Sequence, residues 1–469
     1  MKGRLKQELH KQLLKTEGFE LAQDRLTSSA VAAQFFGHAG LPAATDSLAY
    51  EPVQRILAIA TSDGRVKFVG QDGVECTASS ASQSATKCLQ FLPKKGALLR
   101  VTEDGDLQLW SLSDGRVLES MPFADPVTSV AIMHDEPFIL LGCASGNVQV
   151  VSMIDSSGNS AMGAVPVHTL EMQPFQVDAE EMKGQGAVTC LTIRSHAGRH
   201  RMLVLHQATG VTIWDLRYEC PVVLARNETA EELAGLAGAK ATCACWIGGQ
   251  GICFALGYST GDICVWGLPG PLQQGVPMNR PLEAVLLAKL RVTPEGEMAE
   301  AVQQLTFIPG CATECPNNLL VLGGQVTEMP PALTILPLDC LSGDGTDQEA
   351  TGATRFQPHS IPWFGAVQGW ALVPPEASIN EFDDPTAIMV LTEGGQLMVH
   401  DLNTFQPVPL SLPLQELQAI THCCMCASAT EGGHGGGLQA ATKLHSVTLE
   451  RLRVRPEYNP NRFRNPKVS

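Results

Sequence analysis

The sequence has little positive charge, few aromatic residues and no long hydrophobic run. It contains 32 Lys and Arg residues against 48 Asp and Glu, a formal net charge of −16, and only 5% of its residues are aromatic. This excess of acid disfavours general binding to a nucleic-acid backbone, which needs clustered cations. No stretch approaches the ~18 uninterrupted apolar residues of a transmembrane helix, and Met1–Lys15 lacks the apolar core of a secretory signal. We therefore expect a soluble, intracellular protein.

The 15 cysteines do not form the dense framework of a small secreted domain, because they are spread over 469 residues. Many occupy positions where a small apolar residue would serve, as Cys253 and Cys264 do inside strand-like runs. We interpret them as free thiols in a reducing compartment. Hydrophobic residues make up 44% of the chain, so most of it can bury a core.

One short pattern recurs along the chain: an apolar strand, a turn dipeptide ending in Gly, and a second strand with alternating apolar positions. The six copies are LAIATSDGRVKFVG (57–70), LLRVTEDGDLQLWSL (98–112), ILLGCASGNVQVVSM (139–153), LVLHQATGVTIWDL (203–216), CFALGYSTGDICVWGL (253–268) and IMVLTEGGQLMVHDL (388–402). Glycine suits the tight turn because it accepts a positive φ without steric cost. The pattern predicts six β-hairpins.

The register after each turn glycine supports this interpretation. The second and fourth positions after the glycine are apolar in five copies: Val66/Phe68, Leu107/Leu109, Val148/Val150, Ile263/Val265 and Leu397/Val399. This is the period of a strand with one buried face. The fifth position holds Trp110, Trp266 or His400, whereas Trp214 falls at the fourth position after Gly210.

The spacing of the hairpins predicts an all-β, seven-bladed β-propeller of degenerate WD-type repeats. The turn glycines Gly64, Gly105 and Gly146 recur at about 41 residues, within the ~40–45 residues of a four-stranded blade. Wider spacing later implies inserted loops, which we place at 155–186, 225–241, 270–300 and 342–358. A less regular pair, 319–324 and 332–338, is the seventh unit, and residues 438–452 either close the ring or begin another. A sandwich needs no equal spacing, and units this short cannot hold the helices of an α/β fold.

Whole phrases also resemble the lethal giant larvae/tomosyn family. LAYEPVQRILAIATSDGRVKFVGQDGVE (48–75) is similar to the opening blade of that family, with Tyr50 in place of Phe and Ala60 in place of Gly. ACWIGGQGICFALGYSTGDICVWGLP (244–269) and AIMVLTEGGQLMVHDL (387–402) resemble two later blades, with His400 where an aromatic is usual. LTSSAVAAQFFGHAGLP (26–42) looks closest to plant-type, tomosyn-like members.

The resemblance implies the first of the two propellers that such proteins contain. The C-terminal RLRVRPEYNPNRFRNPKVS (451–469) is interrupted by prolines and cannot form the heptad helix of an R-SNARE segment. We therefore expect a basic N-terminal helix or arm at 1–25, a propeller at 26–454 and a disordered Pro/Arg/Asn-rich tail at 455–469.

No motif predicts catalysis, a cofactor or a metal. The HCCMC run (422–426) and His434 lack a second metal-binding knuckle, and Cys243/Cys245 and Cys311/Cys315 lack flanking histidines. GGHGGG (432–437) lacks the Lys-Ser/Thr of a phosphate loop, so we expect a flexible loop. Trp110, Trp214 and Trp266 are interpreted as core residues, and paired acids in predicted loops as solvated side chains.

The N-terminal segment has a physical signature of its own. Its cations, Lys2, Arg4, Lys6, Lys11 and Lys15, outnumber the single acid Glu8, and Leu5, Leu9 and Leu13 share one helical face. A basic amphipathic helix can lie on an anionic membrane surface. A disordered arm, or a helix docked on the propeller, is the alternative.

Together these observations predict a non-catalytic scaffold. The family resemblance implies binding to syntaxin-type SNAREs, regulation of exocytosis, and a Rab-type GTPase or a myosin as further partners. It also implies a cytoplasmic protein that associates peripherally with the plasma membrane. The alternative is a generic WD-repeat adaptor in another complex, such as a ubiquitin-ligase substrate receptor.

Overall fold

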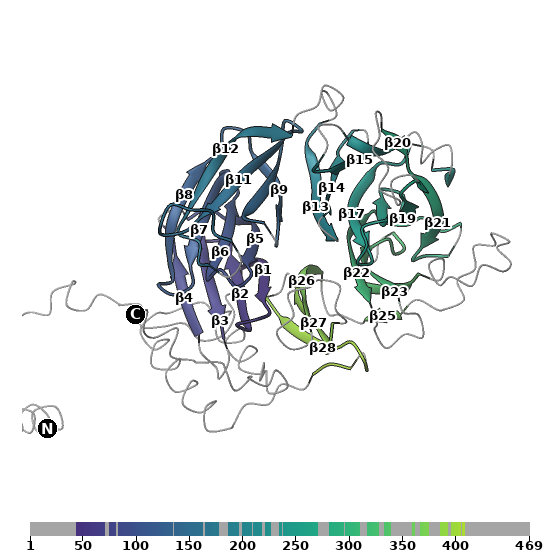
Figure 1. Ribbon diagram of the computed structural model, residues 1–469. Coiled ribbons are helices and arrows are strands. Elements are labelled where there is room, and N and C mark those ends of the chain that lie inside the picture. The colour runs from purple at the N-terminus through teal and green to yellow at the C-terminus, as the bar shows by residue number, and fades with distance from the viewer. Residues whose placement is uncertain are drawn as a thin grey trace, which may run out of the picture. The chain divides into compact units, whose positions relative to one another are not determined.

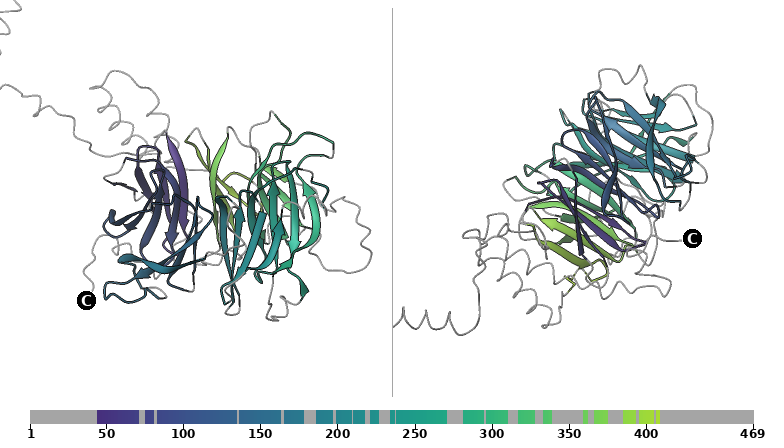
Figure 2. Two further views of the ribbon diagram at one scale, coloured as in Figure 1. Left: turned by 90° about the horizontal axis from the view of Figure 1, so that it is seen from above. Right: turned by 90° about the vertical axis from the view of Figure 1, so that its left-hand side faces the viewer.

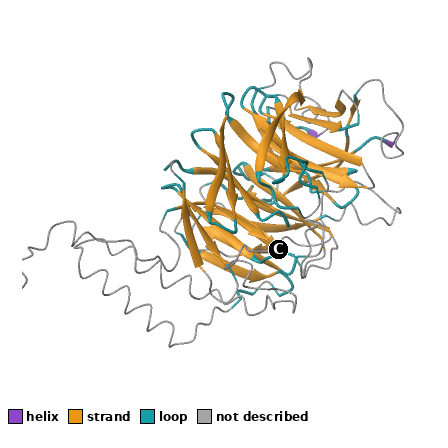
Figure 3. Ribbon diagram, turned by 60° about the vertical axis from the view of Figure 1, so that its left-hand side comes forward, coloured by secondary structure: helices purple, strands orange, loops and turns teal. Residues whose placement is uncertain are grey.

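The computed structural model describes residues 44–408, apart from gaps at 71–74, 81–82, 135, 163–164, 178–185, 197–198, 209, 218–220, 227–233, 237, 271–280, 295, 310–316, 328–332, 339–358, 362–365, 375–384, 393–394 and 405. The chain forms two compact units, Met1–His38 and Ala39–Ser469. All described residues lie in the second unit, which is described by itself. Almost all of their regular structure is strand (Figure 3).

Seven sheets follow one another along the described chain, and each sheet is one blade (Figure 1). Blade 1 is β1 (Thr45–Glu51), β2 (Ile56–Thr61), β3 (Arg65–Val69) and β4 (Glu75–Ser79); blade 2 is β5 (Thr86–Leu92), β6 (Ala97–Thr102), β7 (Asp106–Ser111) and β8 (Arg116–Pro122); blade 3 is β9 (Val127–Ile132), β10 (Phe138–Cys143), β11 (Val148–Ile154) and β12 (Thr169–Val177). Blade 4 is β13 (Val188–His196), β14 (Arg199–His206), β15 (Gly210–Asp215) and β16 (Pro221–Arg226), with the short β20 (Leu282–Glu283) paired parallel to β16. Blade 5 is β17 (Ala241–Ile247), β18 (Cys253–Tyr258), β19 (Asp262–Gly267) and β21 (Val285–Arg291); blade 6 is β22 (Val302–Pro309), β23 (Asn317–Gly323), β24 (Leu333–Pro337) and β25 (His359–Ile361); blade 7 is β26 (Val367–Val373), β27 (Ala387–Thr392) and β28 (Leu397–Asp401).

The hydrophobic core closes these blades into a ring. It consists of seven clusters, and each cluster lies between two neighbouring blades. The last cluster returns to the start of the chain: Met389 and Leu391 of blade 7 pack with Leu57 and Ile59 of blade 1. Figure 2 shows the light green strands of blade 7 beside the purple strands of blade 1. The predicted seven-bladed propeller is therefore confirmed, and its ring closes within residues 45–402.

The turn glycines adopt the conformation that the repeat predicts. Gly64, Gly105, Gly146, Gly261 and Gly395 all have positive φ, between 67° and 94°. The backbone N–H of each glycine donates to the carbonyl three residues earlier, as Gly64 does to Thr61 at 2.9 Å. Each therefore closes a tight turn between the second and third strands of its blade.

The central strands of the blades are buried on both faces, whereas the sequence predicts one buried face per strand. The predicted apolar positions are buried, but so is the opposite face of the same strands: Lys67 is 0% exposed and Gln108 is 2% exposed. The reason is that each blade is covered on both sides by its neighbours, so the two central strands have no solvent-facing side. The polar residues of the alternation are therefore buried and paired rather than solvated.

Two of the segments predicted as inserted loops contain outer strands. Residues 155–186 include β12, and residues 270–300 include β20 and β21. Outer strands have one face toward solvent, and in β21 exposed and half-buried residues alternate over most of its length. This mixed composition explains why the apolar pattern did not reveal them.

At the innermost strands, large side chains of one blade pack against small side chains of the preceding blade. Leu89 and Phe91 of β5 pack toward Ala49 of β1, and Leu305 and Phe307 of β22 pack toward Cys243 and Cys245 of β17. The cysteines thus serve as small packing residues, as predicted, and burial raises the pKa of Cys243 to about 12.

Each innermost strand also has a register shift at its start, such as the one between Ala241 and Cys243. This shift is a β-bulge, and it is repeated in all seven blades.

Several predicted features lie outside the described residues. They include the N-terminal helix and its five cations, the 26–42 phrase, the HCCMC run, GGHGGG, the 438–452 pair and the C-terminal tail. Among the described residues, no helix has the length and apolar character needed to span a bilayer.

Candidate interaction surface

The hairpin turns and the starts of the innermost strands lie at one end of the ring, which we call the turn end. In blade 1, Thr45 at the start of β1 pairs with Thr61 at the end of β2, and the other blades repeat this register. Side chains at this end also bridge neighbouring blades. The carboxylate of Asp46 accepts from the backbone N–H of Thr86 at 3.2 Å, and the hydroxyl of Thr242 donates to the carbonyl of Val302.

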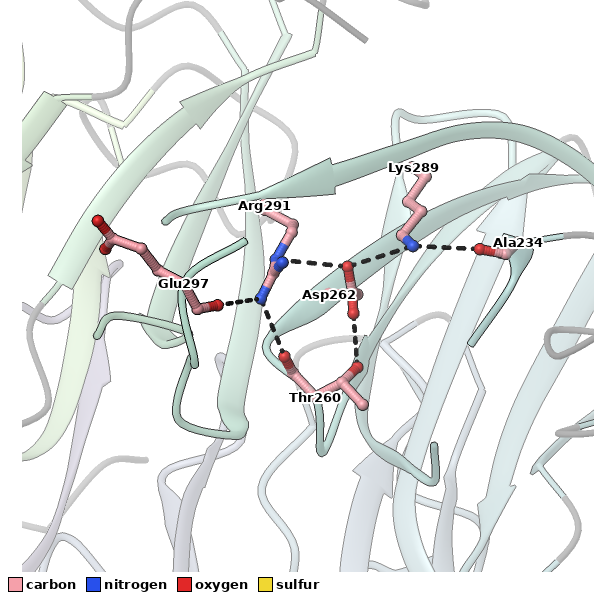
Figure 4. Close-up of polar contacts among 6 residues, drawn as sticks. All are labelled: Ala234, Thr260, Asp262, Lys289, Arg291 and Glu297. Carbon is pink, nitrogen blue, oxygen red and sulfur yellow. Dashed lines mark hydrogen bonds and ion pairs between the residues drawn. The ribbon is translucent and has the colours of Figure 1, made fainter. Parts of the chain in front are cut away.

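A charged cluster lies at the turn end of blade 5 (Figure 4). Asp262, 5% exposed at the start of β19, forms ion pairs with Lys289 and Arg291 of β21, each at 3.5 Å. The hydroxyl of Thr260 donates to the other carboxylate oxygen at 2.6 Å. Arg291 also donates to the carbonyl of Glu297 at 3.1 Å, and Lys289 to the carbonyl of Ala234 at 3.1 Å. One buried carboxylate thus organises two cations from the outer strand.

The local backbone fixes this arrangement. Gly261, between Thr260 and Asp262, has a φ of 80°, and a Cβ there would lie 2.4 Å from the Cβ of Ala299. Only glycine fits this close approach. The turn of blade 5 therefore packs directly against the segment that leads into blade 6.

Two apolar side chains stand exposed beside the cluster. Met298 is 80% exposed and Val326 is 39% exposed. Their segments pair through a bridge between Ala299 and Val326, and the backbone N–H of Thr327 donates to the carbonyl of Met298 at 3.1 Å. An exposed methionine on a hydrogen-bonded backbone, next to fixed charges, is suited to contact another protein.

The chemistry available here is recognition rather than bond-making. Asp262 is occupied by two cations and a hydroxyl, so it is not placed to act as a general base. Among the described residues, no group of three or more His, Cys, Asp or Glu side chains is arranged to hold a metal ion.

The structure places the predicted tryptophans in the core. Trp110, Trp214 and Trp266 are at most 3% exposed, and each pairs with the second strand of its own blade. Cys243 lies in a hydrophobic cluster. The proposed membrane-contact residues Lys2, Arg4, Lys6, Lys11 and Lys15 lie outside the described residues.

The blade 5 cluster was not predicted from the sequence. Asp262 stands inside a recognised phrase, but its partners follow residues 271–280, in a segment interpreted as a loop. The alternation of VLLAKLR (285–291) was the available signal, since it is typical of a half-buried strand.

Comparisons with known proteins support the family resemblance. No family model matches the chain. "LLGL scribble cell polarity complex component 2" is 25% identical over 82% of this chain in its human form and 23% identical over 78% in its zebrafish (Danio rerio) form. "Lethal(2) giant larvae protein homolog 1" from mouse is 38% identical over 16% of this chain.

The chain spans 35% of the length of the human relative and 33% of the zebrafish one, and its match to the mouse homologue covers 7% of that protein. Among solved structures, a chain of the mitotic checkpoint complex aligns with a TM-score of 0.51 at 15% identity, covering 79% of this chain and 93% of that one. That likeness shows the propeller fold alone. The plant-type, tomosyn-like branch stays a prediction. Over most of its length, the chain is therefore similar in sequence to proteins of the lethal giant larvae family, and it has the fold of a seven-bladed propeller.

Proposed function

We propose that this chain is a non-catalytic scaffold that regulates SNARE-dependent vesicle fusion. The observation that carries the proposal is the similarity to lethal giant larvae proteins over 82% of the chain. A closed ring of seven packed blades supports it, because such a ring holds its loops in fixed positions for partners.

The proposed partners are syntaxin-type SNAREs, with a Rab-type GTPase or a myosin as further candidates. The basis is the family resemblance of the blade 1 and blade 5 phrases. In this proposal the protein is cytoplasmic and reaches the plasma membrane through its N-terminal cations.

The turn end of blades 5 and 6 is the proposed contact surface. Met298 and Val326 supply apolar area, and the partly exposed Lys289 supplies a cation at its edge. A SNARE segment forms an amphipathic helix, which would lay its apolar stripe on Met298 and its acidic flank toward Lys289.

The test is direct binding of the purified full chain to the cytosolic part of a plasma-membrane syntaxin-type SNARE. Met298→Asp should weaken binding at least about 10-fold, since it places a charge in the apolar contact. Met162→Asp is the matched control, because Met162 is 47% exposed but lies on blade 3 at the other end of the ring. Equal loss in both variants, or no binding by the native chain, contradicts the proposal.

A second candidate is a role in cell polarity. The names of the human and zebrafish relatives describe components of the scribble cell polarity complex. Co-precipitation with that complex, combined with no SNARE binding, would favour this role. Binding to neither leaves a generic adaptor in another complex.

A further inference from the structure

Blade 7 has fewer strands than any other blade within the described residues. Its sheet contains β26, β27 and β28, whereas each of the other six sheets contains at least four strands. In blade 1 the fourth strand, β4, pairs antiparallel with β3 along five residues in regular register. The corresponding position in blade 7 is the outer edge of β28 (Figure 1). Such an edge can pair with any extended segment that offers backbone N–H and C=O groups.

The chain reverses direction directly after β28. The carboxylate of Asp401 accepts from the backbone N–H groups of Asn403 and Thr404, at 2.8 Å and 3.0 Å. The hydroxyl of Thr404 accepts from the backbone N–H of Gln406 at 3.4 Å. Asp and Thr side chains that bond to the backbone in this way stabilise tight turns. The turn returns the chain along the outer edge of β28.

The returning residues pair with this edge in antiparallel register. The backbone N–H of Asp401 donates to the carbonyl of Gln406 at 3.0 Å. Two residues further along, the N–H of Val408 donates to the carbonyl of Val399 at 2.8 Å. An antiparallel bridge lies between these two hydrogen bonds, with Pro407 on one side of it and β28 on the other. The described chain thus begins a fourth strand for blade 7.

This register decides which backbone nitrogens face β28. Residues of an antiparallel pair alternate between hydrogen-bonded and non-hydrogen-bonded positions. Gln406 and Val408 take hydrogen-bonded positions, so the nitrogen of Pro407 faces away from β28. Proline has no N–H to donate, and in a sheet it is therefore suited to an edge strand with its nitrogen toward solvent.

The residues that follow, Pro-Leu-Ser-Leu (409–412), keep this alternation in their sequence and lie outside the described residues. In the same register, Pro409 and Ser411 have nitrogens that face outward. Leu410 has an inward N–H and stands opposite Leu397. Both prolines thus occur where a missing N–H removes no ladder hydrogen bond, and the residues between them keep the N–H that the ladder needs.

The side chains follow the same alternation. Val408 is partly buried and packs against the cluster between blades 7 and 1. Leu397 and Val399 of β28 belong to this cluster and are at most 7% exposed. Because successive side chains of a strand point to opposite faces, Leu410 falls on the same face as Val408. An apolar residue there extends the cluster that closes the ring.

We propose that residues 407–412 form the fourth strand of blade 7 and dock on the outer edge of β28. Leu410 exchanges hydrogen bonds with Leu397 and adds its side chain to the joint between blades 7 and 1. The outward positions then hold Pro407 and Pro409, and an edge that contains prolines is a poor template for the strand of another protein. Blade 7 is in this way completed by its own chain. This edge takes no part in the proposed SNARE contact.

The test is amide hydrogen exchange of the full chain, resolved to single residues. In the native chain the N–H of Leu410 should exchange at least about 10-fold more slowly than that of Ser411, because Leu410 donates to β28 and Ser411 faces water. This comparison needs no variant. Equal exchange rates at the two residues contradict the proposal.

Three variants separate the ladder hydrogen bond from side-chain packing. Leu410→Pro removes the inward N–H and should speed exchange of the Leu397 N–H at least about 10-fold. Leu410→Ala keeps the inward N–H and should have a smaller effect. Ser411→Pro is the matched control, because it adds the same ring at an outward position and should leave exchange at Leu397 unchanged. A thermal melt of each variant shows that the ring remains folded, and equal effects of the two proline variants contradict the proposed register.

Two other occupants of this edge are distinguished by the same measurement. Protection of the Leu397 N–H that survives Leu410→Pro but is lost on deletion of residues 438–452 assigns the edge to that later segment. Protection that appears only at high protein concentration assigns the edge to a second copy of the chain. Either result overturns the proposal.

Discussion

Blades 2 and 5 fill equivalent buried positions with different side chains, polar in blade 2 and apolar in blade 5. In both, a buried tryptophan of the third strand pairs with the second strand, Trp110 with Leu98 and Trp266 with Phe254. Two residues away, blade 2 pairs Arg100 with Gln108, whereas blade 5 pairs Leu256 with Cys264. All four of these side chains are at most 2% exposed.

In blade 2 the buried charge is satisfied by a complete network. Arg100 donates to the hydroxyl of Thr86 at 2.7 Å and to Gln108 Oε1 at 3.0 Å, and Trp110 Nε1 donates to the same oxygen at 3.2 Å. The guanidinium lies 6.0 Å from the centre of the Trp110 ring. The pairing register of the second and third strands thus places equivalent residues at the same buried position in both blades. That position accepts either a polar or an apolar pair, provided that every buried polar group has a hydrogen-bond partner.

The largest expected effect comes from moving the charge of blade 2 into blade 5. Leu256→Arg would bury a guanidinium among Phe254, Cys264 and Trp266, which offer it no carboxylate. We expect a loss of about 4 kcal/mol or more in the free energy of unfolding, or no folding at all. Urea unfolding measures this loss; a variant as stable as the native chain would show that the site admits water.

The reverse change in blade 2 should cost somewhat less. Arg100→Leu removes the partner of Thr86 and one partner of Gln108, for a loss of about 3 kcal/mol. Adding Gln108→Cys and Thr86→Ala copies the composition of blade 5 and should recover part of the loss. A triple variant less stable than the single one would contradict the equivalence of the two blades.

The turn glycines sharpen the same comparison. At Gly261 of blade 5 an added Cβ meets Ala299 at 2.4 Å and the carbonyl of Glu300 at 2.9 Å, whereas at Gly105 of blade 2 its nearest neighbour is 3.7 Å away. Gly105→Ala should cost about 1–2 kcal/mol for its backbone conformation alone, and Gly261→Ala about 2 kcal/mol more. Thermal melts of both variants test this order. Equal losses of stability would show that the segment around Ala299 and Glu300 moves to accommodate the added Cβ.

The pH dependence should separate blade 4 from blade 5. Blade 4 buries His206, which bonds the carbonyl of Gly146 at 3.1 Å, at the position where blade 5 has Tyr258. Burial lowers the pKa of His206 below its ordinary 6.5, so the unfolded chain takes up the proton first. The contribution of buried, neutral His206 to the free energy of unfolding should be fully present above about pH 6.5 and should fall as the pH drops below this value. His206→Gln should flatten this fall, whereas His168→Gln, an exposed control, should not.

The smallest effect on stability is expected outside the blades. Deleting residues 1–15 removes the five cations and Glu8 and should leave the melting temperature unchanged. Each cation near an anionic leaflet contributes about 1 kcal/mol at most. Full-length protein should therefore float with phosphatidylserine vesicles only at low salt, and the deletion variant should not. Equal flotation of both proteins would assign the segment to a docked or disordered arm.

The sequence predicts the hairpins because their strands are the most deeply buried parts of each blade. It does not predict β12 or β21, since an outer strand has one face in water and mixes polar with apolar residues. Nor does it predict the bulge at the start of each innermost strand. The bulge is a register shift between strands, and its residues range from Asp46 to Thr242 without a common side chain. The sequence does not predict the Asp262 cluster for a related reason, because its partners Lys289 and Arg291 lie on β21, whose mixed composition predicts a loop.

The joint between blades 1 and 7 has a mechanical consequence. Within the described residues no strand is shared across it, and it is held by the side chains of one cluster and a hydrogen bond from Thr45 to Gln368 at 3.2 Å. Every other joint is also crossed by the covalent chain. A pulling force applied at the two ends of the ring therefore loads this joint first, and the ring should open there into a row of blades. Joining residues 44 and 408 by a linker would move the weakest joint to wherever the chain is cut.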